Sequence, residues 1–226
     1  MGNSLAIPVI TIDGPSGSGK GTIARRVAEA LGFHLLDSGA LYRLTAISAN
    51  KCGVELDDAE AVAKLARRLN VRFDSHDDGS ERIWLDDEDV TREVRKETTG
   101  AGASTVAAIP SVREALLVCQ QGFERLPGLV ADGRDMGTHV FPSALLKIFL
   151  TASAEERARR RHKQLKYKGV DVTLAALSRD IEDRDRRDSE RSVAPLKPAK
   201  DARILDSSGK SVEAVTQTVL DWVAEL

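Results

Sequence analysis

The sequence predicts an α/β protein with a parallel sheet covered by helices on both faces. Short apolar runs alternate with segments of helical periodicity along the chain. The first run leads directly into a glycine-rich loop and a helical pattern, and residues 71–90 alternate instead between apolar and polar residues. We therefore expect a parallel core with a small antiparallel insertion, and the length of 226 residues suits one large domain carrying such an insertion.

Five short aliphatic runs predict the buried parallel strands. The first is β-branched, covers residues 8–12 and breaks at Gly14. The others cover residues 34–36, 128–131, 146–150 and 202–205. Three of the runs are followed by an aspartate, namely Asp37, Asp132 and Asp206.

Helical patterns lie between these strands. After the glycine-rich loop, apolar residues recur at Ile23, Val27, Ala30 and Leu31. Further helical patterns cover residues 41–50, 110–125, 154–166, 173–187 and 212–224. Within residues 71–90, the acidic stretch 76–79 predicts the turn of the hairpin.

Composition excludes several classes of protein. The net charge of −2 and the 4% aromatic content argue against a nucleic-acid-coating protein. Two cysteines, Cys52 and Cys119, are too few for a disulfide scaffold and lack metal-ligand spacing. Neither a leader peptide nor a run of about 20 apolar residues is visible, so we expect a cytoplasmic protein with no membrane or nucleic-acid partner.

A phosphate-binding loop is the strongest motif. It follows the first predicted strand and opens a predicted helix, so that backbone N–H groups and the helix N-terminus converge on phosphate oxygens. A mobile lysine then supplies a cation for the β and γ phosphates. The loop consists of Gly14, Pro15, Ser16, Gly17, Ser18, Gly19, Lys20, Gly21 and Thr22.

The loop departs from the usual pattern after its lysine. Gly21 stands where a hydroxyl residue commonly binds Mg²⁺, and the hydroxyl comes one position later, at Thr22. Either Thr22 substitutes for it, or Mg²⁺ is held with ATP mostly through phosphates and water. We expect no dedicated metal site made of protein side chains.

Two further motifs follow predicted strands. In residues 37–43, Ser38 is expected to cap the next helix and Arg43 to face the cleft at the carboxyl edge of the sheet. In residues 131–137, Gly133 and Gly137 are expected to permit tight turning around Arg134 and Asp135. Both motifs favour a substrate site over a helix cap or a loop ion pair.

Two charge-rich helices are less specific. Residues 155–161 favour a solvated face with Glu-to-Arg pairs at i to i+4. Arg184, Asp188 and Arg191 are spaced by four and three residues, so we expect one helical face to present both charge signs. Such a face suits a sugar hydroxyl and a phosphate together.

Taken together, the motifs resemble those of bacterial-type cytidylate kinases over essentially the whole chain. The resemblance is carried by residues 12–22, 36–43, 112–116, 131–138 and 193–195. It implies a single P-loop kinase domain over residues 1–226 that transfers the γ-phosphoryl group of ATP to CMP or dCMP with Mg²⁺. It also implies a monophosphate-binding region near residues 38–105, with the antiparallel insert near 70–91, and a short helical lid near 153–170.

The resemblance further implies roles for individual residues. Cytosine contacts fall on Ser104, Arg113 and Asp135, and ribose contacts on Arg184 and Asp188. Acceptor-phosphate contacts fall on Arg43, Arg134 and Arg191, and Ser38 and Tyr42 belong to the same CMP-binding set. Catalytic charge neutralisation is expected from Lys20, Arg134, Arg191 and the lid arginines Arg157 and Arg161.

Two other functions remain open at this point. A kinase of the same fold could act on UMP, AMP or a small metabolite, because the P-loop alone does not select the acceptor. A noncatalytic nucleotide-binding or RNA-associated protein is a second alternative, which the composition disfavours. We expect a monomer that binds ATP and CMP or dCMP.

Overall fold

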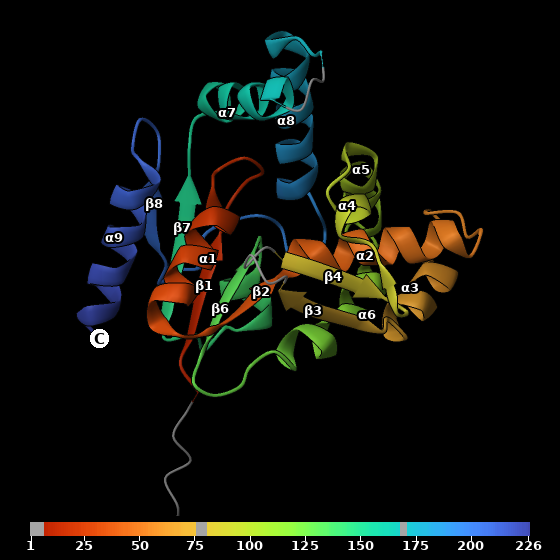
Figure 1. The fold of residues 1–226 in the computed structure, drawn as a ribbon, viewed down its shortest axis with the longest axis horizontal. Coiled ribbons are helices and arrows are strands. Elements are labelled where there is room, and N and C mark those ends of the chain that lie inside the picture. The colour runs from red at the N-terminus through yellow and green to blue at the C-terminus, as the bar shows by residue number, and fades with distance from the viewer. Residues whose placement is uncertain (1–6, 76–80, 168–170) are drawn as a thin grey trace, which may run out of the picture. The chain divides into compact units, whose positions relative to one another are not determined.

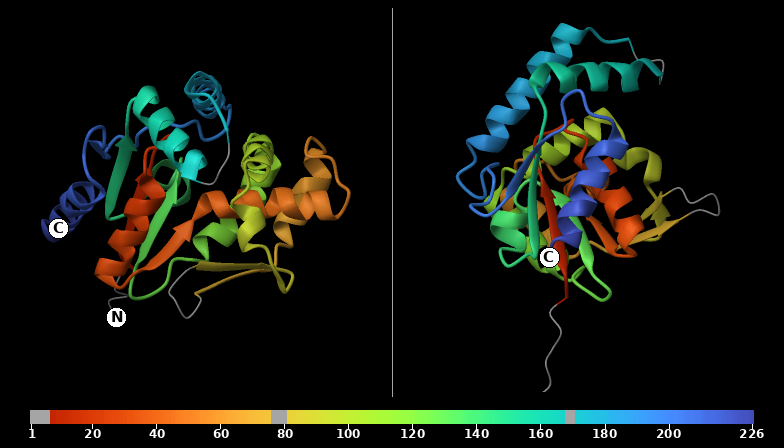
Figure 2. Two further views of the ribbon diagram at one scale, coloured as in Figure 1. Left: turned by 45° about the horizontal axis from the view of Figure 1, so that its top comes forward. Right: turned by 90° about the vertical axis from the view of Figure 1, so that its left-hand side faces the viewer.

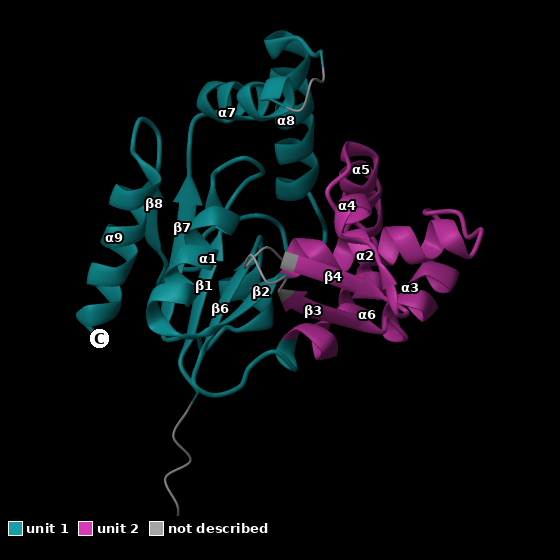
Figure 3. Cartoon of the chain, in the orientation of Figure 1, with its two compact units in different colours: residues 1–37, 121–226 teal, residues 38–120 magenta. Residues whose placement is uncertain are grey.

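The structure, a computed structural model, describes residues 7–75, 81–167 and 171–226 (Figure 1). The chain divides into two compact units, one of residues 1–37 and 121–226 and one of residues 38–120 (Figure 3). Among the described residues, the first unit carries a five-stranded parallel sheet and the second a three-stranded antiparallel sheet. The parallel core and the antiparallel insert predicted from the sequence are thereby confirmed.

The sheet of the first unit has β1 at its centre. The strand order is β2-β6-β1-β7-β8, and each neighbouring pair is parallel. Each strand lies within about two residues of the predicted run. The bounds are β1 (Val9–Asp13), β2 (His34–Asp37), β6 (Leu129–Gly133), β7 (Leu146–Thr151) and β8 (Arg203–Asp206).

Helices α1 (Lys20–Leu31) and α9 (Val212–Ala224) cover one face of this sheet (Figure 2). Ile10 and Ile12 of β1 pack in the same buried cluster as Val27 of α1 and Val219 of α9. Because side chains alternate along a strand, Asp13 points to the opposite face. There it meets the short π-helical segment η1 (Met136–Val140).

A helical pair follows β7 and completes the first unit. Helices α7 (Ala154–Tyr167) and α8 (Leu174–Ser189) cross near the top of Figure 1 and share a small apolar cluster. Ala158 and Leu165 of α7 are buried against Leu177 and Ile181 of α8. The range predicted for the lid, residues 153–170, includes α7. Its last three residues lie outside the described residues.

The second unit combines helices with the antiparallel sheet. The cluster at its centre joins Leu44 and Ile47 of the first helix to Ile83 and Leu85 of the central strand. The predicted turn at 76–79 lies outside the described residues. The elements are α2 (Ser38–Lys51), α3 (Ala59–Arg67), β3 (Val71–Ser75), β4 (Glu81–Leu85), β5 (Glu88–Asp89), α4 (Thr91–Val94), α5 (Glu97–Val106) and α6 (Pro110–Gln121).

Several sequence expectations need correction. Ser38 is not a helix cap, because β2 runs directly into α2 and Ser38 is the first helical residue. Arg191 does not share a helical face with Arg184 and Asp188, because α8 ends at Ser189. Helix α6 ends at Gln121 instead of residue 125.

Among the described residues, no single helix has the length and apolar character of a membrane span. Helices α5 and α6 reach that length and apolar character only when they are counted together, and they meet at a bend of 104°.

Candidate active site

The glycine-rich loop stands where the sequence places it, between β1 and α1. Gly17 and Gly19 have φ angles of 79° and 93°, a left-handed conformation that favours glycine. Gly19 precedes the first residue of α1, and no side chain caps that end of the helix. The predicted strand, loop and helix are therefore confirmed, and the arrangement leaves a helix N-terminus facing the loop.

Side chains from α7 and from the residue after β8 donate hydrogen bonds to backbone oxygens of the loop. Arg157 NH1 donates to the carbonyl oxygen of Ser16 at 3.0 Å, and Arg160 NH1 donates to that of Ser18 at 3.3 Å. The Ser207 hydroxyl, just after β8, lies 3.0 Å from the same Ser18 oxygen, to which it donates. Sequence reasoning missed Arg160 and Ser207 as loop contacts.

Lys20 forms a buried pair with Asp132 at the end of β6. Lys20 Nζ lies 3.9 Å from Asp132 Oδ1 and 3.5 Å from the Pro15 carbonyl oxygen. Burial lowers the pKa of Lys20, and burial raises the pKa of Asp132 to about 7. Within the described chain, Asp132 Oδ1 accepts no hydrogen bond, which is unusual for a buried carboxylate oxygen.

Gly21 explains how this carboxylate fits. A Cβ atom built on Gly21 would lie 3.0 Å from Asp132 Oδ2. The space that a side chain at this position would occupy therefore already holds the carboxylate. Thr22, the hydroxyl one residue later, is exposed.

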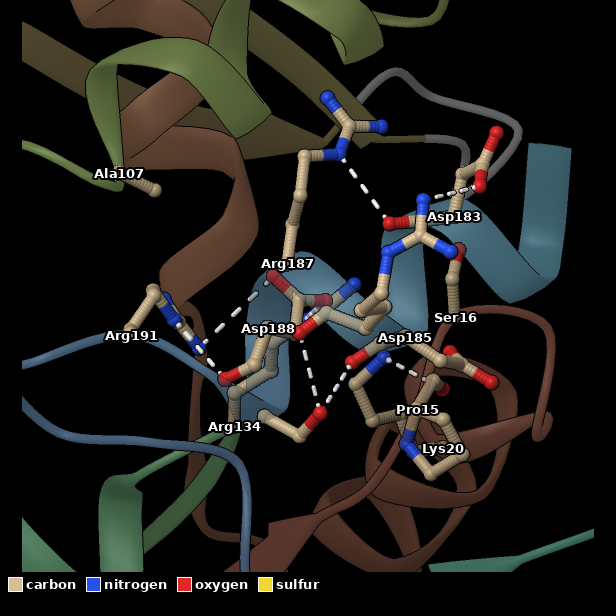
Figure 4. A network of polar contacts seen from close by, with 12 residues as sticks. Pro15, Ser16, Lys20, Ala107, Arg134, Asp183, Asp185, Arg187, Asp188 and Arg191 are labelled. Carbon is tan, nitrogen blue, oxygen red and sulfur yellow. Dashed lines mark hydrogen bonds and ion pairs between the residues drawn. The ribbon is translucent and has the colours of Figure 1, made fainter.

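Arginines surround Asp188 near the same loop (Figure 4). Arg134 Nε donates to Asp188 Oδ2, and Arg191 NH2 lies 3.8 Å from Asp188 Oδ1. Burial raises the pKa of Asp188, but the charges of Arg134, Arg191 and Arg184 outweigh it and hold that pKa below its usual range. Arg134 NH2 is buried and makes no hydrogen bond to any described residue. The charges of Arg134 and Arg184 also help to lower the pKa of Lys20. Cationic groups thus gather beside the loop.

The two lid arginines differ in their surroundings. The Arg157 side chain is 5% exposed, and its NH1 and NH2 donate to the two carboxylate oxygens of Asp185 at 3.1 and 2.5 Å. Arg161 NH1 donates to Gln164 Oε1 at 3.1 Å. The predicted pairs from glutamate to arginine at i to i+4 are present, from Glu155 to Arg159 and from Glu156 to Arg160.

The motif around Arg134 and Asp135 does not form the expected tight turn. Gly133 ends β6, and Gly137 lies inside η1. A Cβ atom on Gly137 would lie 2.7 Å from Thr11 Oγ1, so glycine is needed here for a close approach to β1. Asp135 is buried at the residue preceding η1.

The second unit contains the remaining predicted residues. Arg43 NH1 donates to the Val94 carbonyl oxygen at 2.9 Å, and its guanidinium passes closely over Gly100. Ser104 Oγ is buried and finds no hydrogen-bond partner among the described residues. Arg113 lies over the Tyr42 ring at 5.6 Å, with its NH1 donating to the Ala107 carbonyl oxygen at 3.2 Å. Ser38 and Tyr42 are both buried.

No group of three or more His, Cys, Asp or Glu side chains within residues 7–75, 81–167 and 171–226 could hold a metal ion.

The comparisons with known proteins address the family. The family model described as cytidylate kinase matches residues 10–225. The chain belongs to the cytidylate kinase family. Curated cytidylate kinases from Pseudomonas paraeruginosa (strain DSM 24068 / PA7) and Stutzerimonas stutzeri (strain A1501) are both 60% identical to this chain. The alignments cover 96% and 97% of this chain, and 95% and 96% of those cytidylate kinases.

A solved structure supports the fold alone. A crystal structure of an uncharacterized protein from Eubacterium ventriosum ATCC 27560 matches with a TM-score of 0.50 at 10% identity. The match covers 97% of this chain and 99% of that chain. It agrees with the fold of this cytidylate kinase family member and says nothing of its substrate.

Proposed function

We propose that this protein transfers the γ-phosphoryl group of ATP to CMP or dCMP, giving ADP and CDP or dCDP. Membership of the cytidylate kinase family supports the reaction. The observation in the structure that carries the proposal is the gathering of Lys20, in a glycine-rich loop, with Arg134 and Arg184. Two phosphate groups must approach each other in this reaction, and both need cationic partners.

The chain's own residues act by positioning and by charge. Phosphoryl transfer requires little covalent chemistry from the protein, so no nucleophilic side chain is needed. The loop N–H groups and Lys20 would bind the phosphates of ATP. Arg134 and Arg191 would bind the acceptor phosphate. The Arg134 NH2 group suits that role, because it makes no hydrogen bond to any residue that the structure describes. Arg184 and Asp188 would hold the ribose.

Mg²⁺ would enter with ATP and supply further neutralisation of phosphate charge. Asp132 is the residue that fits this ion, because its buried Oδ1 has no hydrogen-bond partner in the described chain. Asp132 would thereby replace the hydroxyl ligand that Gly21 lacks. The Thr22 hydroxyl is the alternative ligand for Mg²⁺. The remaining ligands would be phosphates and water.

The lid arginines require a change of partner. Arg157 is bonded to Asp185 and to the Ser16 carbonyl oxygen, so it would stabilise transferred charge only after exchanging one of these contacts. Arg161 is the second proposed lid cation. Closure of this segment over ATP would exclude water that otherwise hydrolyses it.

Base selection follows from hydrogen-bonding capacity. Cytosine presents an amino donor and an unprotonated ring nitrogen, which suit a carboxylate and a guanidinium respectively. We assign the amino group to Asp135 and the ring to Arg113, with Ser104 assisting, since its buried hydroxyl has no partner among the described residues. Ser38, Tyr42 and Arg43 complete the CMP-binding set. Uracil would place its carbonyl oxygen against the carboxylate and its ring N–H against the guanidinium. This mismatch should make kcat/KM for UMP a hundredfold or more lower than that for CMP.

An acceptor screen tests the proposal. With Mg-ATP fixed, CMP and dCMP should release ADP far faster than UMP or AMP, and ADP release without any monophosphate should be negligible. Asp135→Ala should lower kcat/KM steeply for CMP and much less for UMP, so that the ratio narrows. Preference for another monophosphate or a small metabolite contradicts the acceptor assignment, and binding without transfer contradicts the enzyme assignment.

The setting of the reaction is part of the same proposal. We propose that the protein works in the cytoplasm as a monomer, with ATP and CMP or dCMP as its partners and without nucleic acid or membrane. Light scattering across a range of protein concentrations, with and without both nucleotides, measures the molar mass and so tests whether the protein is a monomer.

A further inference from the structure

Asp13 is a buried carboxylate that no sequence motif assigned to a substrate. It is the last residue of β1, directly before the glycine-rich loop, and only 5% of it is exposed. Its Oδ1 accepts the backbone N–H of Met136 at 2.8 Å, and its Oδ2 accepts that of Gly137 at 2.8 Å. Each carboxylate oxygen is thus bonded to a different peptide group of η1.

These bonds fix one end of a very short segment. At the other end, Gly133 of β6 is the ladder partner of Asp13 itself. Only Arg134 and Asp135 lie between Gly133 and Met136, so both are held between two attachments to the same residue. On its other side, Asp13 continues into Gly14 and the glycine-rich loop.

We infer that Asp13 is a positioning residue that sets the Arg134 and Asp135 side chains for the acceptor nucleotide and ties them to the donor loop. This inference rests on the proposed function, in which Arg134 binds the CMP phosphate and Asp135 the cytosine. A carboxylate is needed because both of its oxygens accept. An asparagine would accept one N–H and turn its own N–H₂ group against the other.

The charged neighbours of Asp13 come from three elements. Lys20 begins α1, Asp132 belongs to β6, and Asp135 precedes η1, and all three interact electrostatically with Asp13. Burial raises the pKa of Asp13 to about 7, although the two N–H bonds act in the opposite direction. Measurements at pH 8 therefore keep most of this carboxylate ionised.

The variant Asp13→Asn tests the inference. At pH 8 we expect the KM and the calorimetric Kd for CMP to rise about tenfold, a change of about 1.4 kcal/mol, while the KM for ATP stays within twofold. If Asp13 had a merely structural role, the variant would weaken the binding of CMP and of ATP alike. An unchanged CMP affinity, or an equal rise for ATP, overturns the inference.

Asp201→Asn is the matched control. Asp201 pairs with the buried Lys147, at 2.9 and 3.0 Å from Nζ, and its carboxylate is not bonded to η1 or to the glycine-rich loop. This variant should lose stability but keep both Michaelis constants. If it also raises the KM for CMP selectively, general destabilisation explains the effect and the inference is wrong.

A measurement on the wild-type enzyme covers the case in which Asp13→Asn does not fold. If the bonds to Asp13 favour CMP binding, CMP must stabilise those bonds by the same factor. CMP alone should therefore slow hydrogen exchange at the Met136 and Gly137 amides several-fold, and an unchanged exchange rate overturns the inference. Wild-type activity on CMP tests the proposed function separately, so the two can fail independently.

Discussion

Gly100 offers a sharp test, because helix stability and substrate binding should respond in opposite directions. It lies in α5, where replacing an interior glycine with alanine normally stabilises the fold by about 0.5–1 kcal/mol. A Cβ atom here, however, would lie 3.1 Å from Arg43 NH1 and 3.2 Å from NH2. The guanidinium, which donates to the Val94 carbonyl oxygen at 2.9 Å, must then shift by a few tenths of an ångström.

The expected size follows from the contact proposed between the Arg43 guanidinium and the CMP phosphate. A hydrogen bond to a charged group contributes about 1.5–3 kcal/mol, and a shift of this size removes less than half of it. We therefore expect Gly100→Ala to raise the KM for CMP about threefold to tenfold, with the KM for ATP unchanged. Steady-state kinetics on both substrates and urea unfolding measure the two effects, and the free energy of unfolding should not fall.

Gly102→Ala is the control on the same helix. Its Cβ atom would meet Leu56 Cδ1 at 3.1 Å and Ala46 Cβ at 3.2 Å, so it crowds apolar packing instead of Arg43. This variant should keep the KM for CMP. The reasoning is refuted if Gly100→Ala binds CMP normally, or if both variants weaken CMP equally.

Three further predictions concern the charged residues of the first unit. Lys20→Ala should lower turnover about a hundredfold or more in a folded protein, and near-normal ADP release would contradict the loop assignment. Asp188→Asn should cost about 3 kcal/mol in urea unfolding, because it removes the buried carboxylate that pairs with the half-buried Arg134. The same variant should raise the KM for CMP more than the KM for ATP. The raised pKa values of Asp13 and Asp132, both about 7, mean that the folded protein holds protons which the unfolded chain releases near pH 4. Through these two carboxylates, stability should therefore fall from about pH 4 to about pH 7, and Asp132→Asn should remove the part of that fall that Asp132 contributes. A difference in stability between variant and wild type that does not change with pH would contradict this.

Strands were easier to predict from the sequence than helices of the second unit. The buried parallel strands are short aliphatic runs, which local sequence shows directly. Helix α5 was missed because Gly100 and Gly102 have low helix propensity, and packing of Gly102 against Leu56 and Ala46 stabilises it instead. Helix α3 was missed despite a usable signal, since the Asp58 side chain accepts the N–H of Ala61 as a helix N-cap.

The residues of the candidate site also fall into two groups, those that the sequence pointed to and those that it did not. Lys20, Arg43 and Arg134 belong to compact motifs that local sequence shows directly, whereas Arg113, Arg157 and Arg161 were assigned only through the family resemblance. The residues that hold them in place were not visible, because their contacts join distant parts of the chain. The Ser207 hydroxyl and the Ser18 carbonyl oxygen are separated by 189 residues, and Asp13 and Met136 by 123. No local periodicity encodes such pairs, which arise only when neighbouring strands end at one edge of the sheet.

The electrostatics of the first unit explain why these positioning contacts matter. Burial and the charges of Arg134 and Arg184 lower the pKa of Lys20, so the protein alone holds this lysine in surroundings that disfavour its charge. Asp132 opposes that effect, but burial raises the pKa of Asp132 as well. Phosphate groups placed beside Lys20 would raise its pKa again and would compensate the neighbouring arginines at the same time. Cations held in place before the substrate arrives need not reorganise during transfer, and this is how fixed charge accelerates a phosphoryl transfer. The contacts of Asp13 and Arg160 keep the loops that carry these cations in place, so we expect their loss to reduce catalysis without removing any cation that contacts phosphate.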